Sequence, residues 1–123
     1  MAVSVFGEFI KRRRAELRLS LRSFAEAAGI DPGNVSRIER GLVPPPESVA
    51  TLDRIASALE FKPRSPAYRE LMDLAAAAKG RIPQDLMTDS EVAARLPILF
   101  RALRNKRLST DQLDQLIESI RKA

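Results

Sequence analysis

Hydrophobic residues recur every three or four positions along most of the chain, which is the spacing of one face of a helix. The pattern runs over residues 6–17, 20–29, 31–40, 49–59 and 65–78. An apolar stripe of this period predicts an amphipathic helix that buries one side and leaves the other in water. We therefore expect an all-α fold in which these helices share a core.

Two of the predicted helices are short and are joined by a tight turn. Ser20 is placed to N-cap the first, and Gly29 can end it in a left-handed conformation without a Cβ clash. Asp31 and Pro32 can begin the second as its N-cap and its first residue. The apolar residues of the two helices face each other across the turn. The segment therefore predicts a helix-turn-helix.

A second helical region follows a connector expected at residues 81–86. Thr88 and Glu91 have the spacing of a capping box, so a helix is expected to begin there. Pro97 lacks the N–H group that the interior of a helix uses. We therefore expect Pro97 to break or kink the helix, and residues 92–96 and 98–103 are interpreted as two segments that meet at the proline.

The final predicted helix begins at another capping-box pair, Ser109 and Gln112, and carries a narrow apolar stripe. A short helix of this kind must bury its stripe on something. We expect a second copy of the chain to cover it, while the chain's own core and a different protein stay open as alternatives. The expected interface consists of apolar residues from the C-terminal helices: Leu99, Phe100, Leu103, Leu113, Leu116, Ile117 and Ile120.

About half of the chain, residues 6–62, resembles the phage repressor and Cro group of helix-turn-helix proteins, the xenobiotic-response-element (XRE) type. The residues that carry the resemblance are Arg14 to Ser20, Phe24, Ala25, Gly29, Val35, Ile38 and Glu39 to Gly41. The resemblance implies a five-helix, lambda-repressor-like DNA-binding domain whose second motif helix enters the major groove. We expect that domain at residues 1–80. A C-terminal helical extension for dimerisation or partner binding is expected at residues 81–123.

Several positions of the motif are candidates for contact with double-stranded DNA. The backbone N–H groups of Leu21 and Arg22 open the first motif helix and can bind a phosphate. On the second motif helix, Asn34 can bind adenine and Arg37 can bind guanine through paired hydrogen bonds. The other candidates on that helix are Gly33, Ser36 and Arg40.

The first helix contributes further basic residues. Arg12 and Arg13 belong to a local excess of positive charge that either lines a phosphate backbone beside the motif or forms a solvated face. The resemblance gives Arg14 another role, because the matching arginine pairs with a glutamate near the end of the recognition helix, here Glu39. Such a pair would hold that helix at a fixed pitch. Two independent surface charges are the alternative.

Composition narrows the classes of function. The net charge of +5 favours a polyanionic partner. The chain has no cysteine and no histidine, which excludes disulfides, thiolate metal sites and the commonest general base. The sequence contains no set of residues with the types and spacing of a catalytic site, and we expect neither an enzyme nor a cofactor. No apolar run approaches the ~20 residues that span a bilayer, so we expect a cytoplasmic protein.

Together with the resemblance, these features predict a bacterial or phage-type transcriptional regulator, acting as a repressor, that binds a pseudo-palindromic DNA site as a homodimer. Two alternatives stay open. The first is an antitoxin that regulates its own operon and neutralises a toxin through residues 82–123. The second is a helical adaptor that does not bind DNA.

Overall fold

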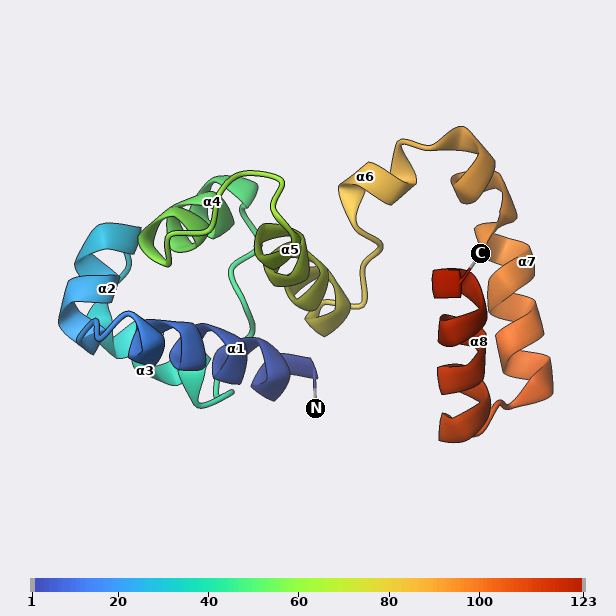
Figure 1. Cartoon of the computed structure of the whole chain (residues 1–123), viewed down its shortest axis with the longest axis horizontal. Helices are drawn as coiled ribbons and strands as arrows, with labels where there is room; N and C mark the ends of the chain where they lie inside the picture. Colours follow the sequence, from blue (N-terminus) through green and yellow to red (C-terminus); the bar gives the residue numbers. More distant parts are fainter. Residues whose placement is uncertain (1, 123) are drawn as a thin grey trace. The chain divides into compact units, whose positions relative to one another are not determined.

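Eight α-helices and no strand make up residues 2–122, the part of the chain that this computed structural model describes (Figure 1). The prediction of an all-α fold is confirmed. The chain divides into two units, the first ending at Pro83 and the second beginning at Gln84. Among the helices of residues 2–122, none is both long enough and apolar enough to cross a bilayer.

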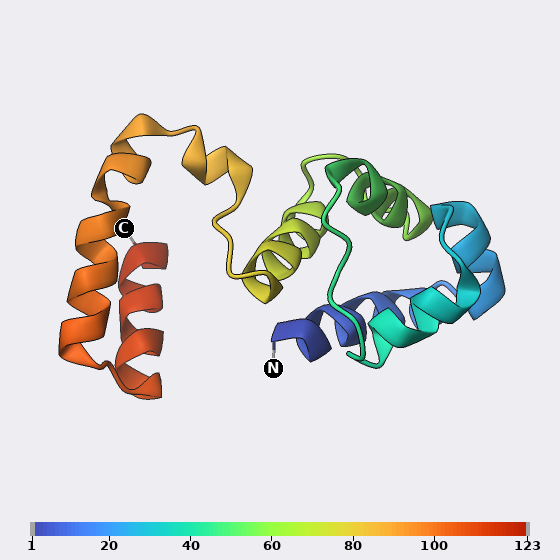
Figure 2. The same cartoon turned by 180° about the vertical axis from the view of Figure 1, so that it is seen from behind.

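The first unit contains five helices around one core. They are α1 (Ala2–Glu16), α2 (Leu21–Ala28), α3 (Pro32–Glu39), α4 (Val49–Ala58) and α5 (Pro66–Ala78). As Figures 1 and 2 show, α1 packs against α3 and α5, α2 packs against α3 and α4, and α4 packs against α5. The buried apolar residues are Phe6, Ile10, Phe24, Ala25, Ala28, Val35, Ile38, Leu52, Ile55, Ala56, Leu59, Leu71 and Ala75. The stripes predicted from the sequence therefore meet in a shared interior.

Side-chain caps mark the starts of four of these helices. The side-chain oxygens of Ser20, Asp31, Ser48 and Ser65 each accept a hydrogen bond from the backbone N–H three residues later, at 3.0 to 3.3 Å. Each cap satisfies an N–H group that has no partner inside its helix. The four helices begin where these residues place them.

The second unit contains α6 (Gln84–Met87), α7 (Ser90–Lys106) and α8 (Thr110–Lys122). Both ribbon views show α7 and α8 side by side and running in opposite directions (Figures 1 and 2). At the start of α8, the Ser109 N–H donates to Gln112 Oε1 at 2.9 Å, and the Gln112 N–H donates to Ser109 Oγ at 3.2 Å. No residue of these three helices is buried. The unit therefore consists of well-capped helices without an interior of its own.

Two boundaries in the second unit differ from those predicted. Residues 84–87 form α6, which begins within the segment 81–86 that we expected to be a connector. Asp89, not Thr88, caps α7: its Oδ1 accepts hydrogen bonds from the N–H groups two and three residues later, at 3.0 and 3.2 Å. The Thr88 hydroxyl instead donates to a backbone carbonyl of α6 at 2.9 Å. Thr88 therefore bonds to the end of α6, and Asp89 caps the start of α7.

Pro97 does not break the helix, and the prediction of a break into two segments is wrong. α7 is continuous from Ser90 to Lys106, with Pro97 inside it. Proline has a fixed φ that is compatible with a helix, but it removes one hydrogen-bond donor and its ring crowds the carbonyl four residues earlier, at a cost of about 3 kcal/mol. A helix with many other hydrogen bonds can therefore continue past it.

Candidate nucleic-acid interface

The motif consists of α2, a short turn and α3. Gly29 follows α2 in the left-handed conformation, with φ of 68° and ψ of 34°. The N–H groups of Gly29 and Ile30 donate back to carbonyls of α2 at 3.2 and 2.9 Å. Asp31 then caps α3, which begins at Pro32. Backbone hydrogen bonds close the turn at one end and a side-chain cap closes it at the other, so the angle between the helices is fixed.

Arg14 connects α1 to the end of α3. Its Nε and one terminal nitrogen donate to the two carboxylate oxygens of Glu39 at 2.7 and 2.9 Å. Its other terminal nitrogen donates to the Leu19 carbonyl, in the turn before α2, at 2.9 Å. Glu39 is the one buried charged residue within residues 5–122, and its hydrogen bond raises the pKa of the Arg14 guanidinium above its ordinary value. One arginine therefore fixes α1, α3 and the start of the motif relative to one another.

Gly7 lets α1 approach α3 more closely than any other residue type would. A Cβ at position 7 would lie 2.4 Å from the Ile38 carbonyl oxygen and 2.5 Å from the Glu39 carbonyl oxygen. Backbone atoms cannot move aside as a flexible side chain can, so the position requires glycine. Sequence reasoning missed this residue, although a glycine inside a predicted helix is the signal that could have revealed it.

Arg54 of α4 supports the motif from the opposite side. Its Nε donates to the Ala28 carbonyl, at the end of α2, at 3.0 Å, and its NH2 group donates to Thr51 Oγ1 at 3.2 Å. A positive charge at the carboxyl end of a helix is favourable because the last carbonyls have no partner inside the helix. The sequence places Arg54 off the apolar face of its helix but gives no sign of this contact.

The outer face of α3 carries the residues predicted to contact DNA. Gly33, Arg37 and Arg40 are exposed, and Asn34 and Ser36 are partly buried. Two guanidinium nitrogens of Arg37 lie 3.5 and 3.9 Å from the point where a Cβ on Gly33 would stand. The head of Arg37 therefore lies near the start of α3, at the same end as Asn34. Arg40 has a different position, because its Nε donates to the Ser36 carbonyl at 3.4 Å.

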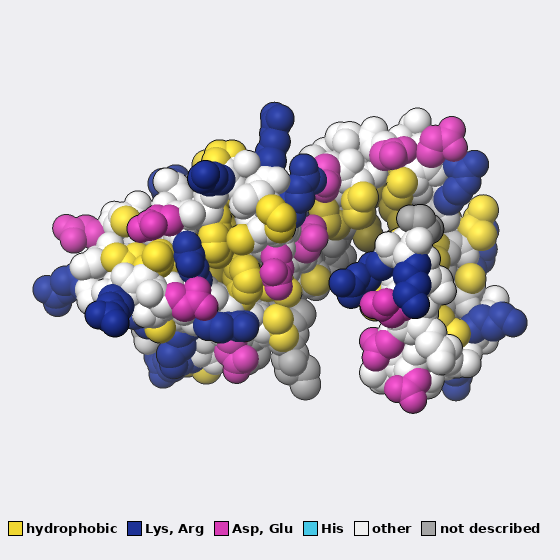
Figure 3. Space-filling model, in the orientation of Figure 1, with side chains coloured by type: hydrophobic (Ala, Val, Ile, Leu, Met, Phe, Trp, Pro, Cys, Tyr) yellow, Lys and Arg dark blue, Asp and Glu magenta, His cyan; other side chains and the backbone are white. Residues whose placement is uncertain are grey.

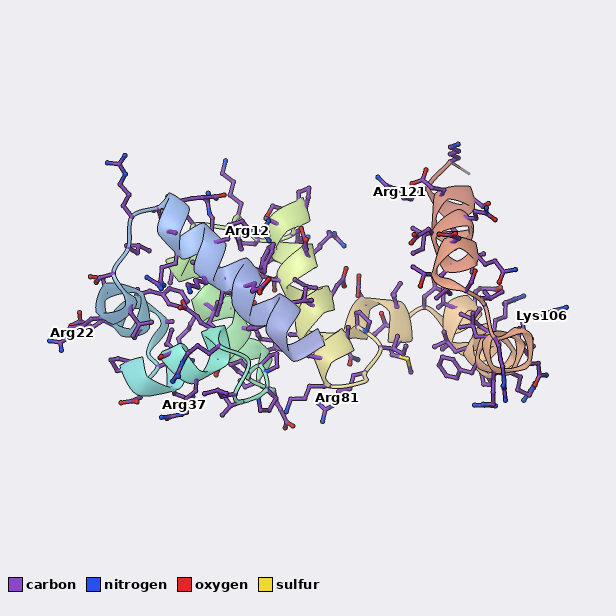
Figure 4. All side chains as sticks on the ribbon, turned by 90° about the horizontal axis from the view of Figure 1, so that it is seen from below. Arg12, Arg22, Arg37, Arg81, Lys106 and Arg121 are labelled. Carbon is purple, nitrogen blue, oxygen red and sulfur yellow. The ribbon has the colours of Figure 1, made fainter. Side chains whose placement is uncertain are left out.

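The start of α2 provides backbone donors. Ser20 Oγ accepts the N–H of Ser23 at 3.0 Å. The N–H groups of Leu21 and Arg22 precede that bond and have no acceptor inside the helix. The Arg22 side chain is exposed. In Figure 4, Arg22 on α2 and Arg37 on α3 lie on the same side of α1.

Arg12 and Arg13 do not join these residues. The Nε of Arg13 donates to the Leu59 carbonyl at 3.0 Å, and its guanidinium lies 5.4 Å from the centre of the Phe61 ring. Both arginines line a hollow that is completed by the connection between α4 and α5. Figure 4 shows Arg12 across α1 from Arg22 and Arg37. Contacts with the Leu59 carbonyl and the Phe61 ring thus hold the Arg13 side chain, and Arg12 lies away from the motif face (Figure 4).

The apolar residues predicted to form an interface lie at the surface of the second unit. Leu103 is partly buried, and the other six are between 39% and 68% exposed. Figure 3 shows hydrophobic side chains reaching the surface of this unit. These side chains are therefore not covered by other residues of the described chain.

A comparison with known protein families matches residues 5–67 to a helix-turn-helix domain. The matched range begins in α1, contains α2, α3 and α4, and ends in α5. No curated protein and no solved structure matches the chain. The family match covers both motif helices and the contacts of Gly7, Arg14 and Arg54 that hold them.

Proposed function

The chain belongs to the helix-turn-helix domain family, and from this premise we propose that it is a transcriptional repressor of the XRE type that acts in the cytoplasm. DNA is the partner that the family implies. The exposed start of α3 supports the proposal most strongly. There, the Arg37 head and Asn34 lie at one end of a helix that Gly7 and Arg14 hold in place. Reading base edges requires polar side chains on a helix that is held at a fixed pitch.

We assign the reading of bases to Asn34 and Arg37. Asn can form two hydrogen bonds with adenine, and Arg can form two with the O6 and N7 atoms of guanine. Each such pair contributes about 1–3 kcal/mol of discrimination against the wrong base. Gly33 adds no side chain of its own to this end of α3, and the Arg37 head lies beside it. The start of α3 therefore offers few but well-placed contacts, and specificity per half-site is modest.

Contacts with phosphates supply most of the affinity in this proposal. The N–H groups of Leu21 and Arg22, the Arg22 side chain, Ser36 and Arg40 are the candidates. Such contacts do not depend on base sequence, and each one makes binding more sensitive to salt. They position α3 on the duplex, and α3 then selects the site.

The second unit pairs two copies of the chain. Burying its exposed apolar face against a second copy would contribute about 25 cal/mol for each Å² removed from water. The α7 helix also carries Arg101 and Arg104, and the α8 helix carries Asp111 and Asp114.

A two-fold contact of this kind uses the same residues on both copies. It would set the two recognition helices about 34 Å apart, which is one turn of DNA, and the binding site would then be pseudo-palindromic. A toxin covering the same apolar face is the competing proposal. In that case the chain would act as an antitoxin that regulates its own operon.

Substitution of Arg37 tests the assignment to base reading. On a duplex selected for binding, Arg37→Ala should weaken binding by about 1–3 kcal/mol and flatten the preference at one or two base pairs. Arg22→Ala is the matched control, because loss of a phosphate contact should weaken selected and random duplexes alike. If Arg37→Ala also weakens both alike, Arg37 contacts the DNA backbone and the assignment is wrong.

A further inference from the structure

Two cations at the end of the first unit converge on one carboxylate that follows the motif. Glu47 lies in the connection between α3 and α4 and is the only charged residue of residues 41–48. The Lys79 ammonium donates to Glu47 Oε1 at 3.2 Å, and a terminal nitrogen of Arg81 lies 3.7 Å from the same oxygen. The hydrogen bond from Lys79, together with the charges of both cations, lowers the pKa of Glu47. The cluster therefore favours a negative charge at this place.

The two cations use their donors differently. Lys79 is 22% exposed, and its hydrogen bond is directed at Glu47. Arg81 is 61% exposed, and its distance of 3.7 Å from the carboxylate is too long for a hydrogen bond. Within residues 2–122, the Arg81 side chain donates no hydrogen bond, and a guanidinium has five N–H donors. Lys79 thus neutralises the carboxylate, whereas Arg81 keeps its donors for another oxyanion.

The cluster lies on the same side of the first unit as the motif residues. Figure 4 shows Arg22, Arg37 and Arg81 on one side of α1 and Arg12 on the other. Glu47 gives a second link to the motif, because the connection that carries it follows directly from α3. The donors of Arg81 are therefore on the face that the proposed function presents to DNA.

The charges of the cluster also suit a polyanion. Glu47 is 60% exposed, and an uncompensated carboxylate on this face would repel phosphates within about 10 Å at 0.1 M salt. Lys79 and Arg81 against Glu47 give the cluster a net charge of +1. An ion pair this exposed contributes little to stability. Neutralisation of the face therefore explains the convergence of the two cations better than a contribution to the fold does.

We propose that Arg81 binds a phosphate of duplex DNA and that Lys79 makes this contact possible by neutralising Glu47. The inference rests on the proposed DNA-binding function and extends its interface from α2 and α3 to the end of α5. Arginine suits such a contact because its donors form a planar fork that matches two phosphate oxygens. Because phosphate is common to every sequence, the contact should serve random and selected duplexes equally.

The test uses three substitutions in the full-length chain. Arg81→Gln removes the proposed contact, and Glu47→Gln removes the negative charge that Lys79 neutralises. Arg12→Gln is the matched control, because Arg12 is also an exposed arginine but lies across α1. Fluorescence anisotropy follows binding to a labelled random-sequence duplex between about 50 and 200 mM salt. Thermal unfolding of each variant shows whether the first unit is intact.

We expect Arg81→Gln to weaken binding several-fold at an unchanged melting temperature. It should also reduce the slope of log affinity against log salt by about 0.9, which corresponds to one phosphate. Glu47→Gln should strengthen binding several-fold, and Arg12→Gln should keep the wild-type slope.

A wild-type slope for Arg81→Gln, or an equal loss for Arg12→Gln, would overturn the inference. Weaker binding by Glu47→Gln would also overturn it, as would a loss for Arg81→Gln that accompanies a lower melting temperature. If the unaltered chain does not bind random duplex even at low salt, the proposed function itself fails.

Discussion

The two units of the chain have equally clear helix ends but differ in what their helices bury. In the first unit, α2 to α5 begin at side-chain caps and every helix adds to one core. In the second unit, α7 begins at Asp89 and α8 begins at a capping box, yet no residue of α6 to α8 is buried. Caps therefore specify where helices begin, whereas burial requires a partner surface.

The presence of a buried core in one unit and its absence in the other suit the two units to different roles. The first has its own interior and can hold a recognition helix at a fixed pitch. The second presents apolar side chains that only another surface can cover, and most of the stability of a helix in a protein comes from such packing. Substitutions in the first unit should therefore lower its stability, whereas substitutions on the apolar face of the second unit should change its association.

Gly7→Ala should destabilise the first unit most. The new Cβ would meet backbone carbonyl oxygens of α3 at 2.4 and 2.5 Å, so the helices must separate. We expect a loss of about 3 kcal/mol in the free energy of unfolding, measured by urea denaturation. Gly33→Ala is the control, since its nearest neighbours are side-chain ends of Asp31 and Arg37. A Gly7→Ala variant as stable as the control would show that α1 and α3 do not pack this closely.

Glu39→Ala and Glu91→Ala compare an ion pair inside the core with one on the surface. Glu39 and Arg14 are 4% and 16% exposed, whereas Glu91 and Arg95 are 80% and 68% exposed at a similar distance of 2.9 Å. We expect a loss of about 2–3 kcal/mol for Glu39→Ala and less than about 0.5 kcal/mol for Glu91→Ala. Thermal unfolding of both variants gives the comparison. Equal losses would mean that burial does not strengthen the first pair.

Leu116→Asp should separate the copies without unfolding the first unit. A charge on the apolar face cannot be buried at a two-fold contact, and it is introduced twice. We expect the dissociation constant of the dimer to rise roughly 10–100-fold, or about 1.4–2.8 kcal/mol, in analytical ultracentrifugation. Gln115→Asp introduces the same charge at the neighbouring position and should leave the dimer intact. If the wild-type chain is monomeric at micromolar concentration, the face serves another partner and the antitoxin proposal gains support.

Glu47→Gln should have the smallest effect and should change how stability depends on pH. Lys79, 3.2 Å away, lowers the pKa of Glu47 mainly by a hydrogen bond, and Arg81 adds its charge. A lowered pKa means that the contribution is fully present above the ordinary value of 4.5 and is lost as the pH falls through the folded value. The difference in melting temperature between wild type and Glu47→Gln should therefore shrink below about pH 4.5. A difference that is constant with pH would contradict this.

Much of the first unit could be predicted because its signals are local. Ser20, Gly29 and Asp31 act at the positions where they stand, and the helical stripes do form the core. Arg14 and Glu39, which the resemblance brought together, are in contact across 25 positions of sequence. The errors in the second unit are also local: Thr88 and Asp89 are both good caps, and the choice between them depended on α6.

Other features depend on distances that a sequence does not contain. The clash that Gly7 avoids involves carbonyls of another helix, and Arg54 reaches the end of α2 from α4. The direction of Arg12 and Arg13 could not be predicted because it depends on where α5 packs. The roles of these residues can be identified only from the three-dimensional packing of the helices.

Selection of bound sequences from a pool of random duplex DNA tests the central claim most directly, with the mass of the complex measured on the enriched sequence. Two copies that each read bases through α3 should enrich a pseudo-palindromic site whose half-sites are centred about one turn apart. The complex should contain two chains per duplex. A pool that shows no enrichment would contradict base reading by Asn34 and Arg37. An asymmetric site occupied by one chain would contradict pairing through the second unit.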